Sequence, residues 1–187
     1  MKRVFVIILA IAAAAMGCRA QGVVEINSTR QAVKRTGDAL LVTMPLATLT
    51  AVIVERDWQG LKQAAFSTAT TLGASYLLKY TVHKMRPDRS DNHAFPSAHT
   101  AVMFANAAFV QRRYGWKFGV PAYVLATYVG WSRTYAKKHD WWDVVTGAAI
   151  GAGSSYIFTR PFAKKHNLAM APVSDGEHFG ITASFNF

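Results

Sequence analysis

The chain has 187 residues, enough for one domain of ordinary size, and 51% of them are apolar while only 17% are charged. This balance excludes a disordered chain, and the single cysteine, Cys18, excludes a disulfide framework or a cysteine-based zinc site. Twenty-one Lys and Arg against ten Asp and Glu give a net charge of +11, which favours phosphate groups, anionic lipid or nucleic acid as partners without choosing among them.

Residues 1–20 have the order of a secretory signal peptide. Lys2 and Arg3 precede a run of twelve uncharged apolar residues, 4–15, and small residues follow as far as Ala20. The apolar run is shorter than the ~20 residues that a bilayer requires. We therefore expect cleavage after Ala20. Acylation of Cys18 as the first residue of a lipoprotein and an uncleaved anchor helix remain as alternatives.

Five long stretches with few charges follow, and none of them alternates with the period of two that is typical of strands. They predict an all-α protein, a single helical bundle of about five core helices within residues 21–160. The expected helices are 39–54 with a kink at Pro45, 63–78, 97–114 ended by Gly115, 118–132, and 144–159 cut off by Pro161. Most of the charge lies in the short segments between them, where we expect the functional site.

The charge-free lengths, mostly fifteen or sixteen residues, fall between those of a core helix and a membrane span. Membrane integration therefore stays open, and we expect membrane association.

Residues 161–187 form a separate C-terminal tail. Phe179, Ile181, Phe185 and Phe187 fall at odd positions in a stretch that resembles a strand. We expect this tail to be packed or frayed.

A first basic cluster is the segment that begins at Lys79 and ends at Arg86 and Pro87. A spacing of seven residues is two helical turns, so we expect Lys79 and Arg86 on one face of a helix that ends at Pro87. Taken alone, the simpler interpretation is a basic helix end exposed to solvent.

A second cluster reads Pro96-Ser97-Ala98-His99. Ser97 precedes an apolar helix and is an ordinary N-cap residue. The free N–H groups and partial positive charge of a helix N-terminus also suit an anion, and His99 would lie beside that anion, able to move a proton.

A third cluster is Ser132-Arg133, then His139 after five residues and Asp143 after three more. The i, i+4 spacing of His139 and Asp143 places both on one face of a helix. A carboxylate that accepts one ring N–H of His139 leaves the lone pair of the other nitrogen free, as a nucleophile requires. Taken alone, a partly buried histidine bonded to a nearby acid is the simpler interpretation.

In this order, the three clusters resemble the motifs of the type-2 phosphatidic-acid phosphatase and vanadium haloperoxidase superfamily. The similarity spans about residues 79–143 and departs at Ala98, where the family usually has Gly. The resemblance implies that His139 attacks phosphorus, that Asp143 orients it, and that His99 protonates the leaving oxygen and then activates water. The phosphate-binding residues that it implies are Lys79, Arg86, Ser97, Ala98 and Arg133.

The resemblance therefore implies a histidine-dependent phosphatase with no metal or other cofactor, because three cations can stabilise the charge that magnesium would otherwise neutralise. No metal cluster is expected, because we interpret His83, His93, His166 and His178 as isolated from any second plausible ligand. The two catalytic histidines must be in opposite protonation states, which predicts a bell-shaped pH–rate profile.

Export places this site outside the cytoplasm, in the bacterial cell envelope, in a periplasmic or membrane-associated protein. The expected substrate is an envelope lipid: phosphatidate, polyprenyl pyrophosphate or lipid A. Within the family, a soluble broad-specificity acid phosphatase is the alternative, while a haloperoxidase would be larger. A non-catalytic binder of anionic lipid or nucleic acid explains the charge but not the spacing of His139 and Asp143. We therefore expect a phosphorylated substrate and a membrane surface as partners, not nucleic acid.

Overall fold

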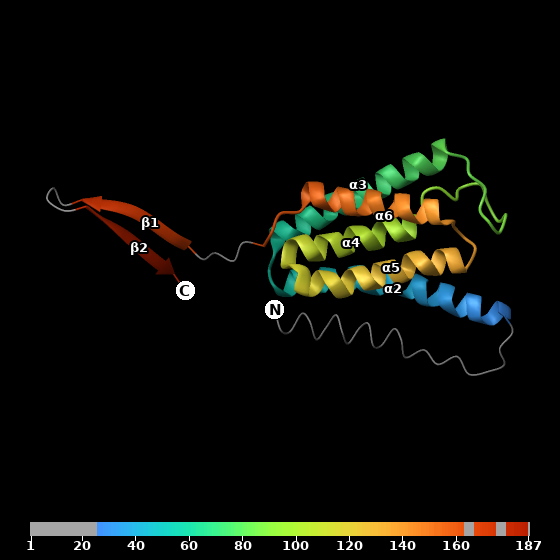
Figure 1. Cartoon of the computed structure of the whole chain (residues 1–187), viewed down its shortest axis with the longest axis horizontal. Helices are drawn as coiled ribbons and strands as arrows, with labels where there is room; N and C mark the ends of the chain where they lie inside the picture. Colours follow the sequence, from blue (N-terminus) through green and yellow to red (C-terminus); the bar gives the residue numbers. More distant parts are fainter. Residues whose placement is uncertain (1–25, 163–166, 175–178, 187) are drawn as a thin grey trace.

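The computed structural model describes the backbone of residues 26–162, 167–174 and 179–186, and the side chains of residues 28–162. The expected signal peptide lies outside the described residues. Five helices lie side by side in the described part, so the prediction of an all-α bundle is confirmed (Figure 1). They are α2 (Ile26–Val54), α3 (Trp58–Thr81), α4 (Ala98–Tyr114), α5 (Trp116–Tyr135) and α6 (Trp141–Phe158).

The observed helices α2, α3, α5 and α6 all begin before the predicted residues, and the differences are explained most clearly for the first and the last. Helix α2 begins at Ile26 instead of residue 39, so its charged N-terminal half is helical too. The helix also continues through Pro45. Helix α6 begins at Trp141 because Asp140 forms a capping box with Asp143: the side chain of each accepts the backbone N–H of the other. Helix α4 ends at Tyr114 before the C-cap residue Gly115, as predicted, and begins one residue after the predicted start because Ser97 is its N-cap.

Helix α4 is the centre of the bundle and contacts each of the other four helices. Its closest approach is to α6, where Gly147 and Gly151 face the α4 backbone around Ser97 and Ala101. A Cβ at Gly151 would overlap the carbonyl oxygen of Ala101. Small residues spaced by four let two helix backbones come together. This contact fixes the N-terminus of α6 beside the N-terminus of α4, where the N–H of Ser97 donates to the carbonyl of Asp143 at 3.0 Å.

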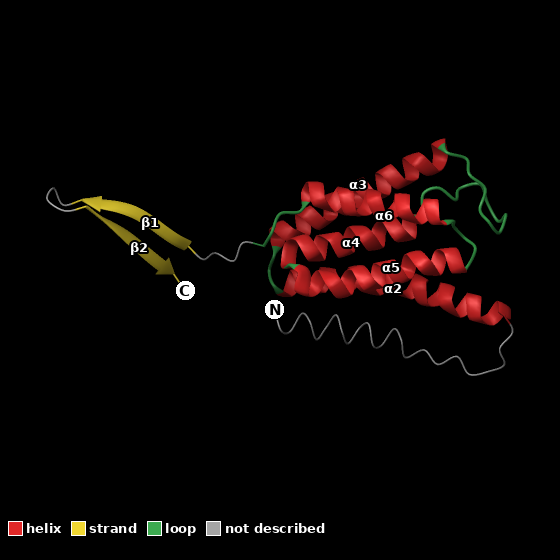
Figure 2. Ribbon diagram, in the orientation of Figure 1, coloured by secondary structure: helices red, strands yellow, loops and turns green. Residues whose placement is uncertain are grey.

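Two loops lie together at one end of the bundle, residues 82–97 between α3 and α4 and residues 136–140 between α5 and α6 (Figure 2). The N–H of Asp88 donates to the carbonyl of Lys137 at 3.1 Å and joins them. The sequence clusters that resemble the phosphatase family all lie at this end.

A buried ion pair closes the opposite end of the bundle. Asp57, between α2 and α3, accepts hydrogen bonds from Arg113 at 2.5 and 2.7 Å, from Tyr114 at 3.0 Å and from the N–H of Gly60 at 2.8 Å. Burial alone would raise the pKa of Asp57, but the hydrogen bonds and the Arg113 charge lower it below its ordinary value. Because Arg113 also donates to the carbonyl of Arg160 at 2.8 Å, this pair joins three chain segments.

The C-terminal tail forms an antiparallel hairpin of β1 (Asn167–Ser174) and β2 (Phe179–Asn186). The odd-numbered apolar residues correctly indicated a strand in β2. The backbone of β2 pairs with β1 along its whole length, from Ser174 opposite Phe179 to Asn167 opposite Asn186, so these segments are not frayed. The alternative that the tail is packed stays a prediction. Phe187 lies outside the described residues.

Among the described helices, one is long and apolar enough to cross a membrane by length and composition. It is the Ser28–Val54 part of α2, with a mean hydropathy of 1.8 in its most apolar window.

Candidate active site

A pocket of about 380 Å³ opens where the ends of α3, α4 and α5 and the two loops meet the N-terminal half of α2. The ten residues that line it include five Lys or Arg side chains and two histidines. They are Lys34, Asp38, Tyr76, Lys79, Arg86, Ala98, His99, Arg133, Lys138 and His139. The structure thus brings six of the eight predicted site residues to one pocket, and the other two, Ser97 and Asp143, are buried.

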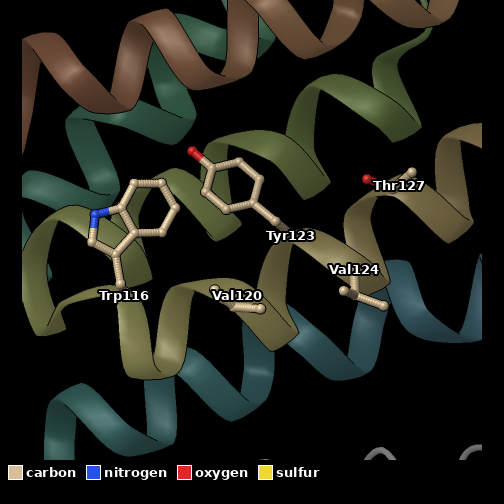
Figure 3. A pocket seen from close by; sticks show the side chains of 5 residues that line it. All are labelled: Trp116, Val120, Tyr123, Val124 and Thr127. Carbon is tan, nitrogen blue, oxygen red and sulfur yellow. The ribbon is translucent and has the colours of Figure 1, made fainter.

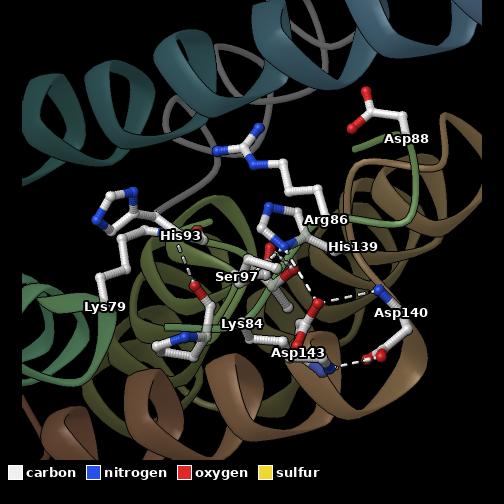
Figure 4. Close-up of polar contacts among 12 residues, drawn as sticks. Lys79, Lys84, Arg86, Asp88, His93, Ser97, His139, Asp140 and Asp143 are labelled. Carbon is white, nitrogen blue, oxygen red and sulfur yellow. Dashed lines mark hydrogen bonds and ion pairs between the residues drawn. The ribbon is translucent and has the colours of Figure 1, made fainter. Parts of the chain in front are cut away.

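His139 lies in the loop before α6, one residue ahead of the N-cap Asp140. The prediction that His139 and Asp143 share a helical face was therefore wrong. Their side chains nevertheless meet, with His139 Nδ1 3.5 Å from Asp143 Oδ2 (Figure 4). The shorter bond runs from Nδ1 to the carbonyl of Ala94, at 2.7 Å. A carbonyl only accepts, so Nδ1 carries the proton and the lone pair of Nε2 is free.

Asp143 is fully buried and shares its carboxylate among several partners. Its Oδ1 accepts from Lys84 Nζ at 2.7 Å, and its Oδ2 accepts from the N–H of Asp140 at 3.0 Å. Lys84 also donates to Asp140 Oδ2 at 2.5 Å. Lys84 therefore connects the loop before α4 to the first turn of α6, beside the carboxylate that faces His139.

The N-terminus of α4 supplies Ala98 and His99 to the pocket wall. By helix geometry, the N–H groups of Ala98 and His99 have no acceptor inside the helix. Ser97 is completely buried, and its hydroxyl accepts from Thr100 at 3.0 Å, so its side chain lies behind the wall. Ala98 is not among the described residues with positive φ, so the usual Gly is not needed here for its backbone conformation.

Lys79 and Arg86 reach the pocket from different kinds of structure. Helix α3 ends at Thr81, so Lys79 lies in its last turn and Arg86 in the following loop. The prediction that they share a helix face was wrong, because α3 ends five residues before Arg86 and not at Pro87. Lys79 donates to the carbonyls of His93 and Pro96 at 2.7 and 3.1 Å. Arg86 Nη2 lies 2.9 Å from Asp91 Oδ2, while its buried Nε has no hydrogen-bond partner among the described residues.

Arg133, at the end of α5, is buried and held by α2. Its Nη1 donates to Asp38 Oδ1 at 2.8 Å and its Nη2 to the carbonyl of Lys34 at 2.8 Å. Asp38 Oδ1 also lies 3.0 Å from His99 Nε2.

Sequence reasoning missed Asp38, Lys34 and Lys84 as residues of this site. One signal for Asp38 was available. It is the only acid between Glu25 and Glu55, inside an apolar helix, where an isolated acid often marks a functional position. Lys84 lies within the first motif, but no spacing rule connects it to Asp143.

The surroundings lower the pKa of both histidines, and different groups act on each. Burial and the charges of Lys79 and Arg86 lower the pKa of His139 to about 3, so its ring is neutral above that pH. Burial and Arg133 lower the pKa of His99 as well, while the carboxylate of Asp38 opposes them. His139 is therefore suited to act as a nucleophile and His99 to exchange a proton.

A second hollow of about 480 Å³ lies along the N-terminal half of α5 (Figure 3). It is lined by Trp116, Val120, Tyr123, Val124 and Thr127, and by no cation. Although it is larger, it offers neither a nucleophile paired with a base nor a cationic site for phosphate.

Among the other histidines, His93 is not as isolated as the sequence suggested. Its Nδ1 lies 3.6 Å from Asp91 Oδ1, and its ring centroid lies 6.1 Å from that of His83.

Comparison with known families decides where this arrangement belongs. The model of the PAP2 superfamily matches residues 60–166. The chain belongs to the PAP2 superfamily. It is 30% identical over 177 residues to a lipid A 4'-phosphatase of Helicobacter pylori, an alignment that covers 87% of this chain and 89% of the relative. The expectation of a phosphatase that acts on a lipid phosphate is thereby confirmed at the level of the family.

Solved structures share the fold of this chain. The crystal structure of Aquifex aeolicus LpxE matches with a TM-score of 0.59 at 19% identity, over 80% of this chain and 92% of that one. A transmembrane PAP2-type phosphatidylglycerolphosphate phosphatase from Bacillus subtilis matches with a TM-score of 0.55 at 23% identity, over 80% and 81%.

Proposed function

We propose that this protein hydrolyses a phosphate group from lipid A in the bacterial envelope, through a phosphohistidine on His139. The observation that carries the proposal is the pocket itself, where a neutral imidazole with a free Nε2 lone pair lies among Lys79, Arg86 and Arg133. The choice of lipid A over phosphatidate or polyprenyl pyrophosphate is supported by the Helicobacter pylori relative, which aligns over most of both chains.

The reaction proceeds in two balanced steps. In the first, His139 Nε2 forms a bond to phosphorus, the ester P–O bond breaks, and the proton of His99 passes to the leaving oxygen. In the second, His99 takes a proton from water, the water oxygen attacks phosphorus, and the N–P bond breaks to release inorganic phosphate. Asp143, 3.5 Å from Nδ1, stabilises the imidazolium that exists between the two steps.

Phosphoryl transfer depends mainly on position and charge stabilisation, which the cations of the pocket provide. Arg86 carries a buried Nε–H that has no partner among the described residues, and a phosphate oxygen would accept from it. The N–H groups of Ala98 and His99, at the positive end of α4, add two donors. Lys79 adds a point charge.

Large apolar side chains are exposed on the four outer helices, which supports contact with a membrane. Examples are Leu46, Phe66, Leu77, Val124, Trp142 and Ile157. We infer that these faces contact lipid, so that the phosphate of a membrane lipid reaches the pocket from the bilayer surface. An exported N-terminus would place the pocket outside the cytoplasm.

The test is phosphate release in EDTA from lipid A, phosphatidate, polyprenyl pyrophosphate and p-nitrophenyl phosphate, by the wild-type protein and by His139→Ala. We expect release from lipid A to be fastest and to fall at least ~10²-fold in the variant. Fastest release from p-nitrophenyl phosphate would favour a broad acid phosphatase. Salt-sensitive binding of lipid A with no release from any substrate would overturn the proposal in favour of a non-catalytic binder.

A further inference from the structure

A carboxylate at the wall of a phosphate pocket is unexpected, because it repels the substrate anion. Asp38 is such a residue. It lies on α2, outside the three motifs, and its side chain is 42% exposed at the pocket. Its Oδ1 meets two proposed site residues at once, Arg133 Nη1 at 2.8 Å and His99 Nε2 at 3.0 Å.

The packing of α2 against α5 brings Asp38 to this position. The neighbouring residue, Gly37, is buried, and a Cβ there would overlap the hydroxyl of Ser132 and the guanidinium of Arg133. Arg133 Nη2 donates to the carbonyl of Lys34, one turn before Asp38. The Lys34 carbonyl and the Asp38 carboxylate therefore hold the two terminal nitrogens of the Arg133 guanidinium. Both contacts depend on the position of α2 along α5.

The effect on His99 follows from charge. Cations dominate the groups that line the pocket with His99, and Asp38 is the one carboxylate among them. These groups are Lys34 and Asp38 from α2, Tyr76 and Lys79 from α3, Arg86 from the loop, Arg133 from α5, and Lys138 and His139 from the loop before α6. Burial and Arg133 lower the pKa of His99, and Asp38 acts against them through its charge and its hydrogen bond. A general acid needs such a counter-charge, because it must carry a proton when substrate arrives.

We infer that Asp38 is a positioning residue for catalysis, which orients the His99 ring and the Arg133 guanidinium and keeps a proton on His99. The inference rests on the proposed function, because it assigns His99 the role of general acid. It joins α2, which carries none of the family motifs, to the chemistry of the site.

The experiment compares the full-length wild-type protein with Asp38→Asn, which keeps the size of the side chain and removes its charge. The first measurement is the pH titration of the His99 ring by NMR in the absence of substrate, with the signal assigned by its loss in His99→Gln. We expect the His99 titration to move to lower pH by about one unit, the usual scale for the loss of an adjacent opposite charge. Because this measurement needs no turnover, it tests the inference even if the proposed function fails.

The second measurement is the pH profile of kcat/KM with p-nitrophenyl phosphate. We expect the basic limb of the Asp38→Asn profile to move to lower pH by about one unit, with most of the activity retained on its acidic side. Asp38→Glu should restore part of the shift. Arg35→Gln, which removes an exposed charge from the same helix, should leave the profile unchanged. A basic limb that stays at the wild-type pH, or a His99 titration that does not move, would overturn the inference.

Discussion

His139 Nδ1 and Asp143 Oδ2 lie 3.5 Å apart across the start of α6, although His139 precedes the helix that carries Asp143. Two different groups therefore control the imidazole. The carbonyl of Ala94, at 2.7 Å, fixes the tautomer, and Asp143 supplies the negative charge. Lys84 Nζ, 2.7 Å from Asp143, partly neutralises that charge.

Replacing Lys84 with Met should make the negative charge of Asp143 more effective at His139 and raise the pKa of the imidazole. We expect the acid limb of the kcat/KM profile to move to higher pH, by about one unit for the loss of one adjacent cation. The measurement is a pH–rate series from pH 3 to 8, with Lys62→Met at the exposed surface of α3 as the control. An unchanged acid limb would show that Lys84 does not tune His139.

The wild-type profile should be bell-shaped with an optimum on the acidic side of neutrality. His139 must be neutral, and its pKa is lowered to about 3, so activity rises as pH increases through that value. His99 must be protonated, and its pKa lies below the ordinary 6.5, so activity in kcat/KM falls as pH increases past it. A profile that rises monotonically to pH 9 would contradict these assignments.

The close contact of α4 and α6 predicts opposite effects for two glycines of one helix. Gly151→Ala places a methyl group against the carbonyl of Ala101, so we expect a loss of about 1–3 kcal/mol in the free energy of unfolding. A Cβ at Gly153 meets nothing within 4 Å, and Ala is the better helix former, so Gly153→Ala should stabilise by roughly 0.5–1 kcal/mol. Denaturant unfolding of the two variants measures both, and equal effects would rule out the observed helix contact.

Removal of the Asp57 carboxylate should be the most damaging single change far from the site. Asp57→Ala leaves the buried charge of Arg113 without its partner, which costs about 3–5 kcal/mol. Asp88→Ala, which breaks a partly exposed pair with Lys138, should cost about 0–1 kcal/mol.

The pH dependence of stability gives a second check on the Asp57 pair. The pKa of Asp57 is lower in the folded protein than in the unfolded chain, so its contribution is present above the unfolded pKa of about 3.9 and is lost as pH falls through the folded pKa. Chemical denaturation from pH 2 to 7 measures this loss. Asp57→Ala should lack this contribution to the acid dependence, and an acid dependence identical to that of the wild-type protein would contradict the interpretation.

The sequence predicted the helical class and most of the pocket because the three motifs lie at helix ends, where hydrophobic periodicity stops and charge begins. It wrongly placed Arg86 and His139 on helices, whereas both lie in loops. The periodicity does not show that α3 ends at Thr81, and the i, i+4 rule for His139 ignores the capping signal of Asp140 and Asp143, an acid followed three residues later by another acid before an apolar run.

The contribution of α2 could not be predicted, because it depends on tertiary contact. Asp38 and Arg133 are 95 residues apart, and no local pattern reports which face of a helix packs against a distant one. The N-terminal half of α2 also contains several charges, and the predicted helix began too late because it was placed on the charge-free run that follows them. The single acid in an apolar helix was the available clue.

The central claim is that His139 becomes phosphorylated during turnover, and it can be measured directly. The wild-type protein is mixed with ³²P-labelled substrate, denatured rapidly in alkali, in which phosphohistidine survives, and digested for peptide mapping. We expect the label on His139, and no labelled peptide from His139→Ala. Release of inorganic phosphate with no label at His139, together with wild-type turnover by a folded His139→Ala protein, would contradict the account.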